Sequence, residues 1–302
     1  MSDLMTTSNK LVAGVLAVLL ATVALAGCTS TPNQNTNNTG NTGNNQQATI
    51  PEVVFTATDY KFTGPDTIPA GLTKVTMRNN GMEWHEIQFF QLPANQTAAN
   101  FTAAMHNGSG HPPMWALHFG GPGATNNTEA TSAYVNFTPG TYVLTCPIPS
   151  PVHRGAPHTS LGMMKFLNVT NATASQTLQP PAANVTVSLR DFSFNNTNNI
   201  TAGNHTIRVT NDGQEPHELI IVELQPGATA EQVLAAFAPG ATAPPPAKPV
   251  GGISAIEPGM TQHVVFTAKS GVSYAFFCFV PSESHGGAPH FALGMMKTIT
   301  VA

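Results

Sequence analysis

Two stretches of the chain carry nearly the same residues. Residues 153–165 read HRGAPHTSLGMMK and residues 285–297 read HGGAPHFALGMMK, so the second copy follows the first by 132 positions. The same offset links Cys146 with Cys278, and residues 79–86 with residues 211–218. Self-similarity at a fixed period indicates one structural unit built twice. We therefore predict two tandem domains, residues 50–170 and 183–302, joined by a Thr-, Ala- and Pro-rich linker over residues 171–182.

Within each unit, short runs of alternating apolar residues are bounded by Gly, Pro and Asn. Such runs predict strands, for example at residues 74–78, 87–92 and 141–145. One short helix is expected in each unit, over residues 97–106 and over residues 230–238. Thr229 and Gln232 form a capping-box pattern at the start of the second helix. The expected fold class is all-β, with two tandem Greek-key β-sandwiches and one short helix in each.

The composition excludes several classes of protein. Charged residues make up 9% of the 302 residues, and the formal net charge is -4. A chain without a basic surface has nothing to hold phosphate backbones, so nucleic acid is not expected as a partner. Hydrophobic residues make up 41%, which is enough for two domains that each bury a core. We expect a monomer.

An apolar run near the N-terminus is typical of an export signal. Lys10 precedes apolar residues 11–26, and the run leads through Gly27 to Cys28. This ending resembles the lipobox of prokaryotic lipoproteins, which implies a signal peptide over residues 1–27 and a lipid on Cys28. An uncleaved anchor helix is the alternative. Both place the protein outside the cytoplasm, anchored to the outer face of the cell membrane, with residues 28–49 as a flexible Asn- and Thr-rich linker.

Acceptor sequences for N-glycosylation are frequent in this chain. Glycans would explain the solubility of a weakly charged protein, whereas a composition rich in Asn and Thr also generates such sequences by chance. Both interpretations stay open. The twelve acceptor asparagines are Asn37, Asn95, Asn100, Asn107, Asn126, Asn136, Asn168, Asn171, Asn184, Asn195, Asn199 and Asn204.

The offset also sorts the eleven histidines. Three recur in matched pairs, namely His85 with His217, His153 with His285, and His158 with His290. A cysteine and a methionine recur with them, as Cys146 with Cys278 and Met163 with Met295. Two imidazoles, one thiolate and a weak thioether form the donor set of a blue-copper site, because the thiolate favours Cu(I) and the imidazoles accept Cu(II). We therefore expect two copper ions, one in each unit.

These motifs resemble those of the cupredoxins, the plastocyanin-like blue-copper proteins, over both halves from about residue 50 to residue 302. In that family a Cys ends a strand, and a Pro-His pair precedes a Gly-Met pair. Residues 142–146 and 157–163 match this pattern, as do residues 274–278 and 289–295. The resemblance assigns one metal site to His85, Cys146, His158 and Met163, and the other to His217, Cys278, His290 and Met295.

The chain departs from the family between the cysteine and the second histidine. Residues 148–156 and 280–288 form insertions, which contain His153 and His285. These histidines could replace the Pro-His ligand, form part of a second metal site, or line an entrance to the site, and positions beside the ligands or on the surface are favoured. Met164 and Met296 are alternative axial ligands, although neighbours on a strand point to opposite faces. Glu86 and Glu218 are expected to face away from the adjacent histidine.

Some alternatives leave no copper site at all. Cys146 and Cys278 could pair as a disulfide in an oxidising compartment, although equivalent positions of tandem copies rarely come close enough. One copy could also be an empty cupredoxin-like module. His106, His111 and His118 have no counterparts and form a candidate second metal site with Met105 and Met114, or an ordinary polar loop.

The expected function is single-electron transfer without a substrate. Trinuclear copper oxidases of the resembling superfamily carry His on both sides of the cysteine, whereas Thr145, Pro147, Phe277 and Phe279 stand there in this chain. A nitrite reductase is also disfavoured. We expect a transient redox protein partner to dock where the loop of residues 157–163 exposes an imidazole edge. A lipoprotein that sequesters or delivers copper, and a surface module with one or both sites empty, are the alternatives.

Overall fold

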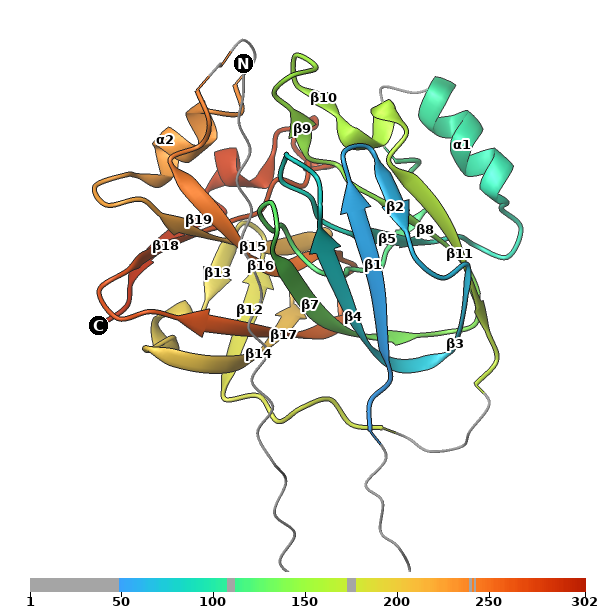
Figure 1. Ribbon diagram of the computed structural model, residues 1–302, viewed down its shortest axis with the longest axis horizontal. Helices are drawn as coiled ribbons and strands as arrows, with labels where there is room; N and C mark the ends of the chain where they lie inside the picture. Colours follow the sequence, from blue (N-terminus) through green and yellow to red (C-terminus); the bar gives the residue numbers. More distant parts are fainter. Residues whose placement is uncertain (1–48, 108–111, 173–177, 239–240, 242) are drawn as a thin grey trace, which may run out of the picture. The chain divides into compact units, whose positions relative to one another are not determined.

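The described part of the chain is built mainly of β-strands (Figure 1). The computed structural model describes residues 49–107, 112–172, 178–238, 241 and 243–302. We call residues 49–172 the first half and residues 178–302 the second half. The strands form sheets that pack face to face, so the predicted all-β sandwich fold is confirmed. The predicted domain boundaries stay predictions.

The described residues of the first half form eleven strands, one α-helix and one 3₁₀-helix. They are β1 (Glu52–Thr58), β2 (Lys61–Thr63), β3 (Thr67–Pro69), β4 (Gly71–Asn79), β5 (Gln88–Gln91), α1 (Ala98–Asn107), β6 (Leu117–His118), β7 (Ala130–Phe137), β8 (Gly140–Thr145), β9 (Pro149–Ser150), β10 (Ala156–Pro157), η1 (His158–Leu161) and β11 (Met164–Thr170).

The second half follows a related order, with β12 (Val185–Arg190), β13 (Ser193–Asn195), η2 (Thr197–Asn199), β14 (Gly203–Asn211), β15 (His217–Leu224), α2 (Ala230–Ala235), β16 (Ala247–Ile256), β17 (Thr261–Ala268), β18 (Ser273–Phe277), η3 (His290–Leu293) and β19 (Met296–Thr300). Each half therefore has one short α-helix among its described residues, as predicted.

One sheet runs through both halves. Its eight strands lie in the order β13-β12-β14-β17-β7-β4-β1-β2. The halves join where β17 pairs antiparallel with β7, with Val264 opposite Ala133 and His263 opposite Tyr134 (Figure 1). A five-stranded sheet, β3-β11-β8-β5-β6, belongs to the first half, and a four-stranded sheet, β16-β15-β18-β19, belongs to the second.

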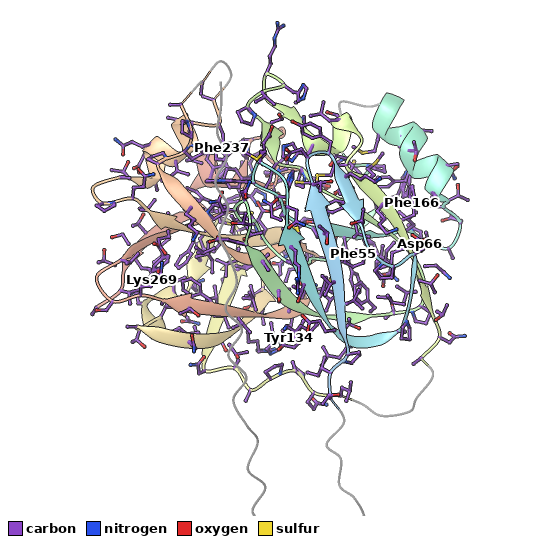
Figure 2. The ribbon with its side chains drawn as sticks, in the orientation of Figure 1. Phe55, Asp66, Tyr134, Phe166, Phe237 and Lys269 are labelled. Atoms are coloured by element: carbon purple, nitrogen blue, oxygen red, sulfur yellow. The ribbon has the colours of Figure 1, made fainter. Side chains whose placement is uncertain are left out.

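The hydrophobic core lies between these sheets. In the first half, Phe55 from β1 (labelled in Figure 2) meets Phe89 from β5 with ring centroids 6.1 Å apart. Both side chains are fully buried, and burial of one such side chain contributes about 1.5–3 kcal/mol. The same core cluster extends into the second half through Val187 and Phe276. Cys146 and Cys278 are part of it, so the apolar packing encloses both predicted copper sites.

A second seam joins the halves beside the eight-stranded sheet. Residues 119–125 of the first half run antiparallel along β16, with bridges from Phe119 to Ile256 and from Thr125 to Val250. The Gln88 side chain closes this seam, because its Nε2 donates to the Ala255 carbonyl at 3.0 Å while its Oε1 accepts from the Ala255 amide at 2.7 Å. The described halves are thus joined by backbone pairing and by a buried amide.

The helix in the second half begins as predicted and ends earlier. Gln232 N donates to the Thr229 hydroxyl at 3.3 Å, and the Gln232 side chain accepts from Thr229 N at 3.0 Å, which completes the capping box. The α-helix ends at Ala235 and not at Ala238, because the next amides bond three residues back, for example Ala238 N to the Ala235 carbonyl.

The N-terminal predictions concern residues that the structure does not describe. The predicted signal peptide (residues 1–27), Cys28 and nearly all of the linker over residues 28–49 lie outside the described residues, as does part of the linker over residues 171–182. Among the helices that are described, none has the length and apolar character needed to cross a membrane.

Candidate metal centres

Three segments of the first half bring its predicted donors together. His85 lies between β4 and β5, where it exchanges backbone hydrogen bonds with Thr125. Cys146 follows the last residue of β8, and His158 begins η1. The Thr159 amide and hydroxyl both donate to the Cys146 carbonyl, at 2.9 and 2.7 Å. These bonds fold the loop that carries the second histidine back onto the cysteine.

A glycine turns the chain from η1 toward the methionine. Gly162 ends η1 with φ 102°, in the left-handed region that favours glycine. The turn returns Met163, whose amide donates to the His158 carbonyl at 3.0 Å. In the second half, Gly294 has φ 115° and the Met295 amide donates to the His290 carbonyl at 2.9 Å. The Pro-His to Gly-Met motif therefore encodes one turn, built twice.

The predicted first site comprises His85, Cys146, His158 and Met163, and the structure brings the donor atoms of the two histidines and the cysteine together. The two imidazole Nδ1 atoms are 3.0 Å apart, and Cys146 Sγ lies 3.4 Å from Nδ1 of His158 and 3.9 Å from Nδ1 of His85. The three atoms are close enough together for one ion at an ordinary metal–ligand distance of about 2.0–2.3 Å to contact all of them. The donor set and its spacing therefore fit a copper ion.

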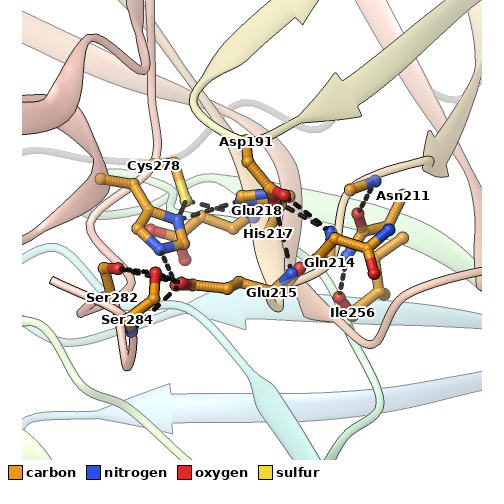
Figure 3. A network of polar contacts seen from close by, with 12 residues as sticks. Asp191, Asn211, Gln214, Glu215, His217, Glu218, Ile256, Cys278, Ser282 and Ser284 are labelled. Carbon is orange, nitrogen blue, oxygen red and sulfur yellow. Dashed lines mark hydrogen bonds and ion pairs between the residues drawn. The ribbon is translucent and has the colours of Figure 1, made fainter.

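The predicted second site comprises His217, Cys278, His290 and Met295, and its two histidines and its cysteine converge in the same way; His217 and Cys278 are labelled in Figure 3. The Nδ1 atoms of His217 and His290 are 3.0 Å apart, and Cys278 Sγ lies 3.3 Å from Nδ1 of His290. The Glu218 amide donates to Cys278 Sγ at 3.5 Å, a bond that favours the thiolate. Within the described residues, the His-Cys-His groups suited to a metal ion are these two.

The paired methionines point into different surroundings. Met163 and Met295 are fully buried in the core cluster that contains both cysteines. Met164 packs against the cluster around Phe101, and Met296 packs against the cluster around Phe277. This separation favours Met163 and Met295 as the axial donors.

Burial changes the acidity of the donors in opposite directions. It lowers the pKa of all four imidazoles, so they are neutral and able to bind a metal at neutral pH. It raises the pKa of Cys146 and Cys278 well above the usual range of a thiol. A metal cation can replace the thiol proton and stabilise the thiolate. Both cysteines are free, so the alternative of a disulfide between them does not hold.

Four carboxylates that sequence reasoning missed contact the imidazoles from behind. His85 Nε2 lies 3.0 Å from Asp59, and His158 Nε2 lies 2.8 Å from Glu83. In the second site, His217 Nε2 lies 2.7 Å from Asp191, and His290 Nε2 lies 2.9 Å from Glu215. Each Nε2–H can donate to a carboxylate, which leaves Nδ1 free for a metal. The repeat carried a signal, because Asp59 and Asp191, and Glu83 and Glu215, are each 132 positions apart.

The insertions cover the second histidine of each site, so the expected exposed imidazole edge is wrong. His158 and His290 are 0% exposed. Over His158, Glu83 Oε1 accepts from the Tyr60 hydroxyl at 2.8 Å and from Ser150 at 3.0 Å. Ser150 belongs to β9 within the insertion, which therefore holds the covering carboxylate in place.

The inserted histidines are not among the converging donors. His153 and His285 are exposed, and they make T-shaped ring contacts with Tyr60 and Phe192, whose rings also contact His158 and His290. His285 Nδ1 lies 3.1 Å from the Ser282 hydroxyl, inside the insertion itself. His153 and His285 therefore belong to the inserted residues that lie over each site.

Glu86 and Glu218 are buried between the halves, a position that the sequence did not indicate. Their side chains are 3% and 5% exposed. Burial raises the pKa of both carboxyls, and the proximity of Glu218 raises that of Glu86 further. Glu218 Oε1 accepts from the Phe279 amide at 2.5 Å.

The candidate second metal site in the first half does not assemble from its described members. His118 Nδ1 lies 3.1 Å from Glu257 Oε1 of the second half. Met105 is buried against Phe101, and Met114 is 83% exposed. The side chains of His106 and His111 lie outside the described residues.

Comparisons with known proteins return distant structural likenesses. No family model and no curated protein matches the chain. Auracyanin A, described as a "blue" copper protein from Chloroflexus aurantiacus, is 18% identical, with 40% of this chain and 100% of that chain covered and a TM-score of 0.29. A dithionite-reduced auracyanin from Roseiflexus castenholzii is 18% identical, with 41% and 99% covered and a TM-score of 0.27.

A blue copper oxidase from Nitrosomonas europaea is 12% identical, with 84% of this chain and 86% of that chain covered and a TM-score of 0.25. At TM-scores this low, such likenesses carry no argument about the chemistry of the sites. The donor atoms and their surroundings carry it.

Proposed function

We propose that this protein binds two copper ions and transfers single electrons through them. His85, Cys146 and His158 would hold the first ion, with Met163 as a weak further donor, and the equivalent residues of the second site would hold the second. The observation that supports the proposal is the convergence of two Nδ1 atoms and one Sγ atom, 3.0 to 3.9 Å apart, in a site whose donor residues are 0% exposed.

When bound, copper supplies the one-electron Cu(I)/Cu(II) couple. The chain's own contribution is to hold the donors in one geometry. The Cys146 carbonyl accepts from Thr159, the His158 carbonyl accepts from Met163, and the His85 backbone is paired with Thr125. Donors fixed in this way rearrange little between oxidation states, and burial keeps water away from the thiolate.

We propose a carrier and not an enzyme. The residues that flank the cysteines are Thr145 and Pro147 in the first site, and Phe277 and Phe279 in the second. None of them can ligate the additional copper ions of an oxidase. Among the described residues, His118 at the junction of the halves is bonded to Glu257. A transient redox protein is the partner that we propose, and a monomer is the proposed state.

A lipoprotein that sequesters or delivers copper is the second candidate function. It needs a metal that exchanges readily, whereas all six His and Cys donors are 0% exposed. Burial therefore favours the electron carrier. The proposed location is the same for both, outside the cytoplasm and attached to the outer face of the membrane through Cys28 or an anchor helix.

An optical spectrum and a copper count test the proposal. We expect intense visible absorption from Cys-to-Cu(II) charge transfer, two copper ions per chain, and a reversible one-electron titration. Cys146→Ser and Cys278→Ser should each remove about half of the colour and one copper ion, and Cys28→Ser, which leaves both sites intact, should remove neither. A colourless wild-type protein with chelator-labile copper would support sequestration, and one without copper would leave an empty surface module.

A further inference from the structure

The carboxylates behind the imidazoles form a distinct charged layer around each site. In the first site, Asp59 contacts Nε2 of His85 at 3.0 Å, and Glu83 contacts Nε2 of His158 at 2.8 Å. The side chain of Glu83 is 11% exposed and that of Asp59 is 31% exposed. Glu215 and Asp191 occupy the equivalent places in the second site, 12% and 29% exposed. Every imidazole donor therefore has its own carboxylate, partly or largely removed from water.

These carboxylates also accept hydrogen bonds from neutral donors. Asp59 accepts from the backbone amides of Met82 and Glu83, and Asp191 accepts from those of Gln214 and Glu215. Glu215 accepts from the hydroxyls of Ser282 and Ser284, and His290 Nε2 lies 2.9 Å from its other oxygen. In the ion pairs of the described residues, these four carboxylates have histidine partners and not Lys or Arg.

The two copies preserve this layer by different means. The Tyr60 hydroxyl that donates to Glu83 has no equivalent in the second site, where Phe192 occupies its place. Ser284 supplies the missing hydroxyl, because its Oγ donates to Glu215. Ser150 and Ser282 supply the other hydroxyl, each at 3.0 Å. The carboxylate oxygen thus receives two hydroxyl hydrogen bonds in both sites, from side chains that differ.

We propose that Asp59, Glu83, Asp191 and Glu215 lower the reduction potentials of the two sites by stabilising Cu(II) over Cu(I). This inference rests on the proposed function. A carboxylate that accepts from Nε2–H makes the imidazole a stronger donor to the metal. Its negative charge also interacts more strongly with a divalent ion than with a monovalent one, and water screens that interaction little at a buried site. Together with the thiolate, the two carboxylates bring each site closer to neutrality with Cu(II) than with Cu(I).

Single-site proteins allow each carboxylate to be tested alone. Cys278→Ser retains the first site and Cys146→Ser retains the second. In these backgrounds, Glu83→Gln and Glu215→Gln remove the charge and keep one oxygen that accepts from the imidazole Nε2–H, while the amide NH2 replaces the oxygen that faces the hydroxyls and can donate to them. Glu257→Gln is the matched control, because Glu257 also contacts a histidine, His118, at 3.1 Å, away from both sites.

Spectroelectrochemical titration gives the readout. At a fixed ambient potential, we expect each Gln variant to lower the Cu(II):Cu(I) ratio at least tenfold, which corresponds to a rise of about 59 mV in the reduction potential. The control should change the ratio less than twofold. If a Gln variant does not fold, Asp59→Asn or Asp191→Asn tests the other imidazole of the same site with the same expected direction.

Failure of this inference can be distinguished from failure of the proposed function. The role of the carboxylates would be overturned, and electron transfer left intact, if the Gln variants are blue but their Cu(II):Cu(I) ratios stay within twofold of those of their parents. A ratio that falls no further than that of the control would have the same meaning. A wild-type protein without the charge-transfer band would overturn the proposed function and this inference with it.

Discussion

The first and second sites have the same four donor types but differ in the residues around them. In the first site, Tyr60 lies against His158 and bonds to Glu83, and Pro147 follows the cysteine. In the second, Phe192 lies against His290, and Phe279 follows the cysteine and packs on Phe291 with centroids 5.4 Å apart. The surroundings have changed between the copies, whereas the carboxylate behind each imidazole has not.

The difference separates what the geometry requires from what it tolerates. The turn with its left-handed glycine, the buried thiol and a pair of carboxylates occur in both copies. The aromatic ring beside the second histidine and the source of one hydroxyl differ. We infer that donor position and local charge are the fixed properties of each site, and that the aromatic surroundings can make the two sites unequal.

The largest effect is expected from a methyl group on the glycine beside the first histidine. A Cβ on Gly81 would lie 2.4 Å from Asp59 Oδ1 and 2.6 Å from His85 Nε2, and a Cβ on Gly213 would meet Asp191 and His217 at the same distances. Gly81→Ala should therefore displace the Asp–His pair, remove the colour of the first site and cost about 1–3 kcal/mol of unfolding free energy. Gly213→Ala should do the same to the second site.

Absorbance, copper content and urea unfolding measure these effects. Met82→Ala is the control, because Met82 is 78% exposed and its bonds to Asp59 come from the backbone amide. Full colour in both glycine variants would show that the Asp–His contact is not needed to hold the donors.

A smaller effect is expected from the buried carboxyl pair between the halves. Burial raises the pKa of Glu218, so the folded protein binds its proton more tightly than the unfolded chain. The contribution of this group to stability is present below the ordinary pKa of about 4.3 and is lost as the pH rises through the raised value, by about 1.4 kcal/mol for each pKa unit. Glu218→Gln stays neutral and can still accept from the Phe279 amide.

The measurement is the unfolding free energy of metal-free protein at pH 5 and pH 8. The buried histidines act in the opposite direction, because burial lowers their pKa. The decisive quantity is therefore the unfolding free energy of Glu218→Gln minus that of the wild type. This difference should become more favourable to the variant as the pH rises. A difference that does not depend on pH would refute the raised pKa. Glu86→Gln should behave similarly, since burial and the nearby Glu218 raise its pKa.

The smallest effect is expected where the two sites differ. Tyr60→Phe removes one of the two hydroxyl donors of Glu83 and should cost about 0.5–1.5 kcal/mol in urea unfolding. Ser284→Ala should cost a similar amount, because it removes the corresponding donor of Glu215. Phe192→Tyr is the control and should stay within about 0.5 kcal/mol of wild type. A neutral Tyr60→Phe together with a costly Ser284→Ala would mean that the hydroxyls are not equivalent.

The sequence indicated the features that are encoded locally or by the repeat. Alternation predicted the strands, Thr229 and Gln232 predicted the start of α2, and the constant offset separated the paired histidines from the others. The convergence of His85, Cys146 and His158 agrees with the predicted grouping, because the loop motif between His158 and Met163 determines its own turn.

The features that were missed depend on contacts between distant segments. Asp59 is 26 positions from His85 in the chain, and nothing in its local sequence shows that it faces an imidazole. The prediction of an exposed imidazole edge at His158 failed because the position of the inserted β9 depends on tertiary contacts with Tyr60 and Glu83. The burial of Glu86 and Glu218 follows from the packing of one half on the other, which a repeat within the sequence does not specify.

The sheet that runs through both halves also limits the open strand edges of this weakly charged protein. Open strand edges invite pairing with other chains, and charged side chains usually discourage it. Here β7 and β17 pair with each other, and residues 119–125 cover the ten-residue strand β16. The strands left at the two ends of the large sheet, β2 and β13, have three residues each. Short terminal strands offer little template for pairing with other chains. The topology of the sheet therefore limits edge-to-edge pairing, which charged side chains limit in most β-proteins.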